Sequence, residues 1–560
     1  MFASTRRGAL IGALSAFSLA PGAAGASGDP RVEATNRLLA PWATMDQPGV
    51  AVAASLDGRT VYSRGHGLAD LEQGTAIAPA TVFRAASVSK QFTAFALMLL
   101  VAEGRASLDD PLSRHIPETA ALGADLRLHH LVRHTGGVRD EILMQMAGWG
   151  AEDPVTDEQA ERLFLRQRGL NFSPGSRFQY TNGGYFLLAR IVERLSGQSL
   201  AAFCKARIFD PLDMADTRFE DDPERITPRR AEGYRKSRDG LRRAGVTGSI
   251  TGPTGLLTTT SDLLRWAANF ETGAIGGPKV MRLMAERESV GGAAHHYAGG
   301  QERHVYRGLE TWSHGGREAG YRAFLLRAPS RRFSVAVLSN RSDFDMAKTA
   351  YDMADIWLAE GLEPARVSTP VAAPDRRRLD ALTGDYELFP GIILSVTAGG
   401  DGLSWRMRGA KGSERLQALS DGAFLLDPKT DVRLEFAPPV AGRAPGLKYR
   451  LGMNGSLDAP RIVLQPFEAG LVDLAAYVGG YESDELDTAY RLFLKDGRLV
   501  ARHPRLSDLP LTPYQPDVFA SPQAFFGRAV FTRSPDGVVD GMVVSGAVAE
   551  GVRFVRTGGG

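Results

Sequence analysis

One stretch of the chain, residues 92–101, is apolar on nearly every side of a helix, and it limits the folds open to the sequence. A helix of this kind is buried in the middle of a domain rather than laid along its surface. Ser87 and Lys90 stand just before it, three residues apart, so a hydroxyl and an ammonium share one face of the first turn. The stretch therefore predicts a central helix that carries a serine and a lysine into the interior.

Such a pair can act as a nucleophile and its base. A lysine accepts a proton near neutral pH only where burial or a second cation lowers its pKa, and a core helix supplies the burial. The positive end of the helix dipole would also face the oxygen that becomes negative during acyl transfer. Ser87-Val88-Ser89-Lys90 is the only Ser-x-x-Lys match in the chain. Because such matches also arise by chance, the chemistry needs support from other residues.

Length, charge and the N-terminus set further bounds. At 560 residues the chain exceeds one hydrophobic core, so we expect two to four domains. A net charge of +2 provides no field that would attract nucleic acid, and we expect none as a partner. Paired arginines, a short apolar run and a small-x-small site predict a signal peptide over residues 1–26. Twin-arginine and ordinary export both fit, and either predicts a periplasmic or secreted protein with no membrane-spanning segment after signal removal.

Cysteine and histidine, which often mark functional sites, give weak signals here. Cys204 is the only cysteine, so no internal disulfide can form, and its apolar neighbours predict a buried thiol. His295, His296 and His304 suggest a metal site, but adjacent strand residues face opposite ways and no carboxylate or cysteine is spaced to complete the set. We therefore expect neither a metal nor a cofactor.

Residues 27–362 are expected to form one α+β domain. An antiparallel sheet begun by a hairpin at Asp57-Gly58, helices flanking that sheet and an all-helical insertion are the predicted architecture. The expected strands are 49–55, 60–67, 321–328 and 333–340, and the expected helices are 126–133, 157–168, 184–196, 263–270 and 345–358.

The remainder of the chain repeats itself. After a linker at residues 363–374, short alternating runs with turn signals indicate β structure. Thr383-Gly384-Asp385-Tyr386-Glu387 recurs as Val478-Gly479-Gly480-Tyr481-Glu482. Two small antiparallel β-barrel domains, at residues 375–470 and 474–560, are the simplest account of this repeat.

Two later clusters carry residues that acyl transfer needs. Tyr180 can relay protons if cationic neighbours lower its pKa, and Asn182 can hold both Lys90 and a substrate carbonyl. Gly315 and Gly316, beside His314, would let a substrate lie against a strand edge. Singly, a tyrosine or histidine is more often a packing residue, but together the three clusters are a strong signal.

With these clusters in this order, the chain resembles the penicillin-recognising serine hydrolases, which include serine-type D-Ala-D-Ala carboxypeptidases, class C β-lactamases, esterases and D-aminopeptidases. The resemblance implies that the backbone amides of Ser87 and Arg317 form the oxyanion hole. The residues that carry it are Ser87-Val88-Ser89-Lys90, Tyr180-Thr181-Asn182 and His314-Gly315-Gly316, supported by His134-Thr135-Gly136-Gly137, Pro174-Gly175, Gly255-Leu256 and Thr260-Ser261-Asp262.

The chain departs from the common pattern in the third motif, where His-Gly-Gly replaces Lys-Thr-Gly. The fixed cation that would hold a substrate carboxylate is therefore missing, unless Arg317 or Arg322 replaces it. The likeness runs furthest, through all three domains, to the D-aminopeptidase branch of the family. That branch implies an aspartate in the last barrel that meets the substrate's free amine, and Asp508 occupies the corresponding place.

These residues predict an exported serine hydrolase that works through an acyl-enzyme, with Ser87, Lys90, Tyr180, Asn182 and His314 as its catalytic residues. The favoured activity is an aminopeptidase that releases N-terminal D-residues from short peptides or amides. An esterase, a D-Ala-D-Ala carboxypeptidase and a β-lactamase remain rivals. A ligand-binding protein with a degenerate hydrolase domain is an alternative of another class, and the oligomeric state is open, with a homodimer among the options.

Overall fold

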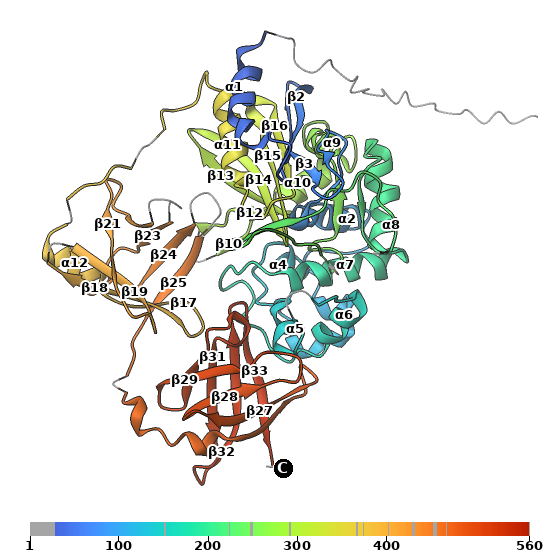
Figure 1. Ribbon diagram of the computed structural model, residues 1–560. Helices are drawn as coiled ribbons and strands as arrows, with labels where there is room; N and C mark the ends of the chain where they lie inside the picture. Colours follow the sequence, from blue (N-terminus) through green and yellow to red (C-terminus); the bar gives the residue numbers. More distant parts are fainter. Residues whose placement is uncertain are drawn as a thin grey trace, which may run out of the picture.

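The computed structural model describes most of the chain after the first residues, and Figure 1 shows its three parts. The predicted signal peptide lies outside the described residues. Among the helices described, none is long and apolar enough to pass through a membrane. The described residues are 28–150, 153–222, 224–246, 250–290, 293–365, 368–372, 374–400, 402–427, 432–451, 456–465 and 467–558.

A seven-stranded antiparallel sheet is the centre of the first part. Its strand order is β12-β13-β14-β15-β16-β1-β2, so the N-terminal hairpin joins the later strands where β1 pairs with β16. The predicted sheet is thereby confirmed. Its strands are β1 (Val50–Leu56), β2 (Arg59–His66), β12 (Tyr297–Ala298), β13 (Gln301–Tyr306), β14 (Leu309–Glu318), β15 (Tyr321–Ala328) and β16 (Phe333–Ser339).

Each face of this sheet packs against helices. Val50, Val52 and Ala54 face α1 (Pro30–Leu39) and α11 (Met346–Trp357), while the alternating Ala51 and Ala53 belong to the core on the other face. Figure 1 shows α1 and α11 together on one side of the strands. The two terminal helices therefore cover one face, as the sequence predicts.

The apolar stretch is the central helix that its composition indicates. In α2 (Ser89–Ala102), 12 of the 14 residues are buried. It packs against α7 (Asn182–Ser196) and α10 (Gly277–Ala285), and α9 (Thr260–Thr272) packs on β1 and β16. These helices cover the face of the sheet opposite to α1 and α11.

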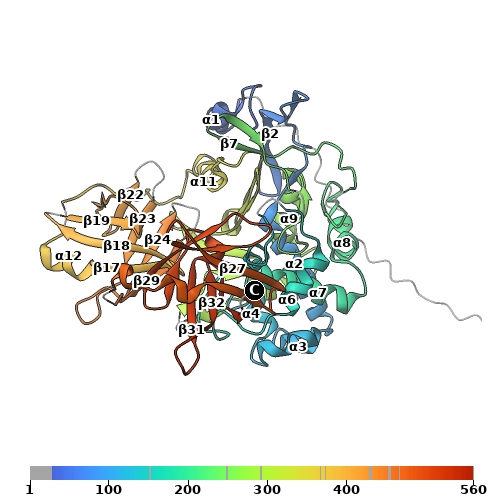
Figure 2. The same cartoon turned by 60° about the horizontal axis from the view of Figure 1, so that its bottom comes forward.

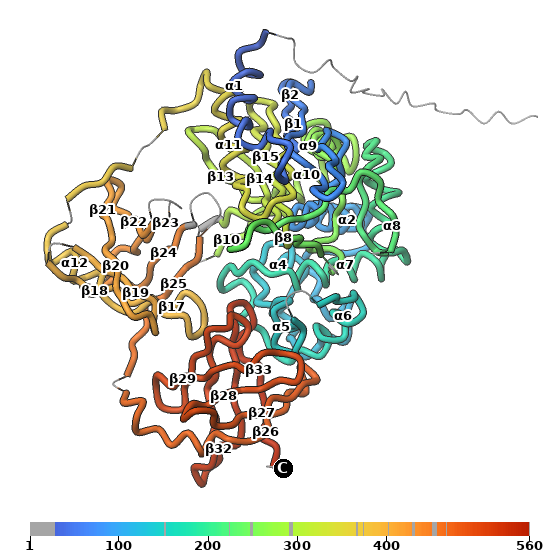
Figure 3. Tube along the Cα trace, viewed as in Figure 1, coloured from blue at the N-terminus to red at the C-terminus, as the bar shows by residue number. Residues whose placement is uncertain are grey.

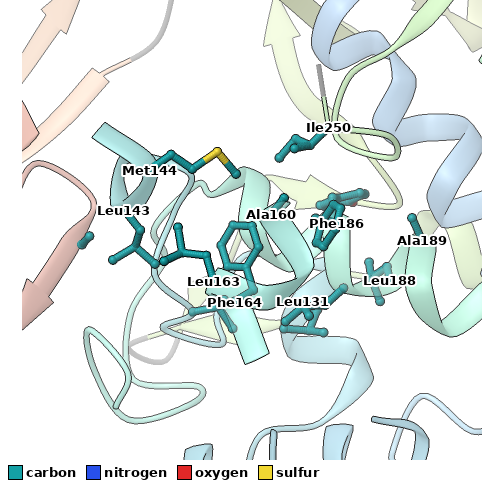
Figure 4. Packing of buried hydrophobic residues seen from close by; sticks show 14 of the residues in the cluster. Leu131, Leu143, Met144, Ala160, Leu163, Phe164, Phe186, Leu188, Ala189 and Ile250 are labelled. Atoms are coloured by element: carbon teal, nitrogen blue, oxygen red, sulfur yellow. The ribbon is translucent and has the colours of Figure 1, made fainter. Parts of the chain in front are cut away.

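The helical insertion adds a second part to the same core. Figure 4 shows Leu143 and Met144 of α5 (Ile142–Met146) and Phe164 of α6 (Asp157–Leu165) in one cluster with Phe186 of α7. The other short elements here are α3 (Leu112–His115), α4 (Leu128–Val132), α8 (Leu200–Cys204), β3 (Leu68–Asp70), β4 (Thr75–Ala76), β5 (Phe83–Arg84), β6 (Arg218–Phe219), β7 (Tyr234–Ser237), β8 (Gly240–Arg243), β9 (Leu256–Thr258), β10 (Ser289–Val290) and β11 (Ala293–Ala294).

The first barrel, strands β17–β25, is closed by one short segment. β20 and β21 are the two edge strands of the nine-stranded sheet: β20 pairs with β19 and β21 pairs with β22. Because β20 and β21 follow each other in the chain, this one segment joins both edges of the sheet. A helix, α12 (Arg376–Leu382), precedes it. The strands are β17 (Gly384–Phe389), β18 (Ile392–Gly399), β19 (Gly402–Met407), β20 (Glu414–Arg415), β21 (Gln417–Ala418), β22 (Phe424–Asp427), β23 (Val432–Phe436), β24 (Gly446–Leu451) and β25 (Ser456–Ile462).

The last barrel, strands β26–β33, is fully closed by the pairing of β26 with β33. Buried side chains of its own strands occupy its interior, among them Tyr490, Phe519 and Phe554. Its strands are β26 (Gly479–Ser483), β27 (Thr488–Lys495), β28 (Arg498–Arg502), β29 (Leu509–Gln515), β30 (Val518–Ala520), β31 (Arg528–Arg533), β32 (Val539–Gly546) and β33 (Ala549–Thr557).

The last barrel lies directly against the helical insertion. Tyr490 donates a hydrogen bond of 2.8 Å to the carbonyl of Met146, at the end of α5. Figure 3 shows the barrel beside α5 and α6, and Figure 2 shows it beside α6 with the first barrel on its other side. The fold class is therefore the one predicted, an α+β domain followed by two β-barrels.

Candidate active site

Ser87 lies in a 3-10 turn, Ala86–Val88, that leads into α2. Its side chain reaches solvent while the residues on both sides of it are buried. Ala86 has a φ of 47°, a left-handed conformation that is uncommon for a residue with a side chain. The turn therefore presents one hydroxyl from an otherwise closed stretch of backbone.

Lys90 is completely buried and points back at this serine. Its Nζ donates to Ser87 Oγ at 3.1 Å, to Asn182 Oδ1 at 2.5 Å and to the Pro253 carbonyl at 3.1 Å. Burial lowers the pKa of Lys90 to about 7, against the opposing effect of Glu141 and other acids nearby. A lysine in this state can accept the proton of a serine near neutral pH.

Tyr180 lies on the other side of the same lysine. The Lys90 nitrogen stands 4.7 Å from the centre of its ring. The condition that cationic neighbours lower the pKa of Tyr180 is not met: burial raises this pKa well above its ordinary value, although Ser87 acts in the opposite direction. The ring of His134, 4.4 Å away, contributes to this closed environment. Tyr180 is therefore a neutral phenol, which can give a proton rather than take one.

His314 belongs to the same cluster through Tyr297. Its Nε2 lies 2.9 Å from the Tyr297 hydroxyl and its Nδ1 lies 2.7 Å from the Gly315 carbonyl. A carbonyl only accepts, so Nδ1 carries the proton and Nε2 accepts from the tyrosine. Burial lowers the pKa of His314 to about 4, so the imidazole is neutral. The third motif thus contributes no positive charge.

The backbone of β14 carries Arg317, whose amide is the predicted second half of the oxyanion hole. Gly316 packs so closely on the carbonyl of Ala85 that a side chain at this position would collide with it. This contact places β14 beside the turn that holds Ser87. Arg317 is the residue that follows Gly316 in this strand. From His314 to Glu318 the pairing described for β14 is with β15 alone, which leaves its other edge open to a substrate.

The side chains of Arg317 and Arg322 lie on the far face of the sheet. Side chains alternate along a strand, and Gly315 lies toward Met346 of α11, so Arg317 shares that face. Arg322 is directly opposite Arg317 in β15 and shares it too. Neither guanidinium therefore replaces the missing cation on the face that carries Ser87.

Two acids that the sequence analysis did not single out lie beside the motif residues. Asp140 Oδ1 accepts the N–H groups of Asn182, at 2.8 Å, and Gly183, at 3.3 Å, and so caps the start of α7. Glu141 Oε1 accepts from Asn182 Nδ2 at 2.8 Å. Burial, and then Asp140, raise the pKa of Glu141. Their only sequence signal is their place just after the His134-Thr135-Gly136-Gly137 match.

A third acid, Glu318, stands at the end of β14. It is paired with Arg84, three residues before the nucleophile, at 3.7 Å. Arg84 also forms a buried salt bridge with Glu220, which in turn holds Arg230. The guanidinium of Arg84 is therefore already occupied by carboxylates.

Asp508 is not among the groups that the structure brings to Ser87. Its carboxylate is bound by Arg502, at 2.8 Å, and by Lys495, at 3.2 Å, on the last barrel. Hydrogen bonding to Arg502 holds the pKa of Asp508 at about 2. Other parts of this barrel contact the segment 139–141, which leads to the motif residues: Glu485 binds Arg139, and in the turn between β32 and β33 the Val548 carbonyl accepts the Asp140 N–H at 3.0 Å. The contacts described for Asp508 thus lie within the last barrel.

The histidines considered as metal ligands form stacked pairs instead. His295 stacks on Phe178 at 3.9 Å, and His304 lies 3.0 Å from Glu302. In the described residues, potential ligand atoms do converge elsewhere, on His129, His130 and Glu288. The Arg127 N–H donates to Nδ1 of His130, so Nε2 of that ring carries the proton and faces the glutamate. His129 Nδ1 lies 3.4 Å and His130 Nε2 3.7 Å from this carboxylate.

The buried thiol is as the sequence predicts. Cys204 is fully buried at the end of α8, and burial raises its pKa. A thiol that stays protonated is a poor nucleophile. Ser87 is therefore the nucleophile candidate in this domain.

Comparison with known proteins places the chain in a family. A D-aminopeptidase of Gluconobacter oxydans is 28% identical over 451 residues, which are 79% of this chain and 81% of that protein. A D-aminopeptidase of Brucella anthropi is 26% identical and covers 91% of this chain and 95% of its own length, barrels included. The octameric penicillin-binding protein homologue of Pyrococcus abyssi has the same fold, with a TM-score of 0.53 at 23% identity over 85% of this chain and 98% of that one. The Beta-lactamase family model matches residues 39–356, and the chain belongs to this family of hydrolases.

Proposed function

We propose that this chain is an exported serine hydrolase that releases N-terminal D-residues from short peptides or amides. Ser87 is the nucleophile, Lys90 the base and Tyr180 the acid. The names of the two relatives reported above, both D-aminopeptidases, agree with this assignment. The rest of the support comes from the charge distribution around the serine.

The observation that carries the proposal is the shortage of free positive charge, among the described residues, on the face of the sheet that holds Ser87. His314 is neutral, the side chains of Arg317 and Arg322 lie on the far face, and Arg84 is held by acids. Against this, Asp140, Glu141 and Glu318 all act on the pKa of Lys90. A site of this kind favours a substrate with an ammonium group over one with a carboxylate.

Glu141 is the acid placed to bind the ammonium group of the substrate. Asp140 is committed to backbone N–H groups, whereas Glu141 is bonded through one carboxylate oxygen to Asn182 and is partly exposed. Its second oxygen can accept from a substrate amine. Because Asn182 also contacts Lys90, the amine would be held within reach of the reacting groups.

The reaction follows from this geometry. Lys90 takes the proton of Ser87, and the serine oxygen attacks the substrate carbonyl while the amides of Ser87 and Arg317 hold the resulting oxyanion. Tyr180 gives its proton to the leaving amine, and Lys90 returns the serine proton to the phenolate. Water then attacks the acyl-enzyme, with Lys90 again as base, and releases the D-residue.

Three p-nitroanilides test the substrate class: D-alanine, N-acetyl-D-alanine and L-alanine p-nitroanilide. We expect kcat/KM on D-alanine p-nitroanilide to exceed that on the acetylated compound by about a hundredfold, because acetylation removes the charge that Glu141 reads. Equal rates on both compounds would remove the aminopeptidase assignment. Faster turnover of p-nitrophenyl acetate or a β-lactam would then favour the esterase or β-lactamase reading.

The Glu141→Gln variant tests the proposed amine ligand. We expect its kcat/KM on D-alanine p-nitroanilide to fall by about a hundredfold, with less than a threefold change on the ester. Asp508→Asn is the matched control, since it removes an acid of the last barrel that is bound to Arg502. If Asp508→Asn lost the activity and Glu141→Gln kept it, the proposed role of Glu141 would be wrong.

A further inference from the structure

Arg139 belongs to the first domain, and its side chain contacts the last barrel. It is buried, and its Nη1 donates to Glu485 Oε2 at 2.6 Å. Its Nε donates to the Glu550 carbonyl at 2.8 Å and its Nη2 to the Gly551 carbonyl at 3.0 Å. The barrel thus surrounds one arginine with three acceptors, two of them backbone groups at the start of β33.

The two residues after Arg139 are the acids beside the motif residues. The N–H of Asp140 donates to the Val548 carbonyl, so the barrel holds this residue as well. Asp140 caps α7 at Asn182, and Glu141 accepts from the amide of Asn182. Asn182 in turn accepts from Lys90 at 2.5 Å. The contacts form one unbroken series from the barrel to the base.

We infer that the last barrel positions the general base: Glu485 and the β32–β33 turn hold Arg139-Asp140-Glu141 against Asn182, and Asn182 holds Lys90 on Ser87. Arg139 and Glu485 are then positioning residues, since neither touches the reacting atoms. The inference rests on the proposed function only for the roles of Ser87 and Lys90.

Docking alone does not require this arrangement. The rim of the same interface already carries the ion pairs Arg177–Glu550 at 2.7 Å and Arg505–Asp153 at 2.6 Å. A buried ion pair adds little net stability over a well-packed apolar contact, because desolvating both charges offsets their attraction. What the buried Arg139–Glu485 pair provides instead is a fixed orientation for the acids that follow it.

The test compares Glu485→Gln with Arg177→Gln in the full chain. Both remove one charge from the same interface, but only the first removes a side-chain partner of Arg139. We expect kcat of Glu485→Gln to fall by about tenfold on both D-alanine p-nitroanilide and p-nitrophenyl acetate, with KM changed by less than about twofold. Arg177→Gln should match the wild type on both substrates.

The pH profile separates positioning from a loss of structure. In the wild type, activity should be lost as pH falls through about 7, where Lys90 becomes protonated. Asp140 and Glu141 raise the pKa of Lys90, so their displacement in Glu485→Gln should move this limb to lower pH by about half a unit. Other groups act on the lysine too, and the variants leave them in place: Glu318, His134, His314, Tyr180 and Tyr185.

A purely structural role predicts a different result. Glu485→Gln would then have a lower unfolding temperature, but its folded fraction would show wild-type kcat and an unmoved pH limb, and this outcome overturns the inference. The ester keeps the two proposals apart. If the wild type turned over only the ester, the aminopeptidase assignment would fail, while the comparison of Glu485→Gln with Arg177→Gln would still decide the inference.

Discussion

The two barrels share one internal bond and differ in what they hold. In the first barrel Tyr386 donates to the carbonyl of Leu382, and in the last barrel Tyr481 donates to the carbonyl of Tyr477, four residues earlier in both cases. Both tyrosines are fully buried. The repeated Gly-x-Tyr-Glu pattern thus marks a shared way of tying the first strand of each barrel to the end of the short helical segment before it.

The loops that follow these two tyrosines make different contacts. In the first barrel the turn at Pro390 and Gly391 packs against Gly527 of the last barrel, beside a salt bridge between Glu387 and Arg528. In the last barrel the corresponding loop carries Glu485, which binds Arg139. The same position in two copies of one fold therefore serves barrel-to-barrel packing in one and the active-site segment in the other.

The contrast shows that the loops of each barrel, rather than its strands, determine which part of the protein that barrel contacts. The first barrel's charges also come near the site: Lys448 and Asp458 act on the pKa of His296, whose burial lowers it. That effect is electrostatic and acts at the margin of the site. Of the two barrels, only the last makes described hydrogen bonds to Arg139 and Asp140.

Charge reversal at the ion pairs Arg139–Glu485 and Arg528–Glu387 should give the largest difference in activity between the two barrels. Glu485→Lys places a second cation against the buried Arg139, at a cost of about 3–5 kcal/mol, and activity should fall by more than about a hundredfold. Glu387→Lys faces the half-buried Arg528, so we expect about 1 kcal/mol and activity within twofold of the wild type. Urea unfolding and turnover of D-alanine p-nitroanilide measure both. Equal loss of activity in the two variants would contradict the division of roles.

Two glycines allow a comparison of intermediate size. Gly391 and Gly551 both have positive φ, 80° and 74°, and alanine is strained there by about 1–3 kcal/mol. Gly551→Ala distorts the turn that holds Arg139, so kcat should fall about threefold to tenfold. Gly391→Ala disturbs only the contact between the barrels and should leave kcat unchanged. If Gly391→Ala reduced kcat more than Gly551→Ala does, the division of roles between the two barrels would be wrong.

The shared tyrosine bond should give the smallest effect, and an equal one. Tyr386→Phe and Tyr481→Phe each remove one buried hydrogen bond, which is worth about 1 kcal/mol. Thermal unfolding followed by calorimetry should show a similar loss for each, with kcat unchanged. A marked loss of activity in Tyr481→Phe alone would mean that the barrel's own core, and not just its loops, acts on the site.

Much of the fold and the core of the site could be predicted because they depend on short-range patterns. The spacing of Ser87 and Lys90 places both on one helical turn, and the apolar residues after them require that helix to be central. The strand pattern of the catalytic sheet and the repeat around Tyr386 and Tyr481 are equally local. The structure brings Tyr180, Asn182 and His314 to the same place, and their roles remain predictions.

The rest could not be predicted because it arises from contacts between distant segments. Asp140 is held by the carbonyl of Val548, and a carbonyl is present in every residue, so no side-chain pattern announces it. The acid in the last barrel that matters for our inference, Glu485, acts through Arg139 and not on a substrate. The raised pKa of Tyr180 likewise depends on the rings that surround it in the folded protein.

The solitary, inaccessible thiol of Cys204 has a practical consequence for these ideas. Because maleimide reagents cannot reach it in the folded protein, a cysteine introduced at any exposed position would be the sole point of attachment for a fluorophore or spin label. A pair of such labels, one on the first domain and one on the last barrel, would report the distance between these two domains during turnover. Cys204 would not have to be replaced first.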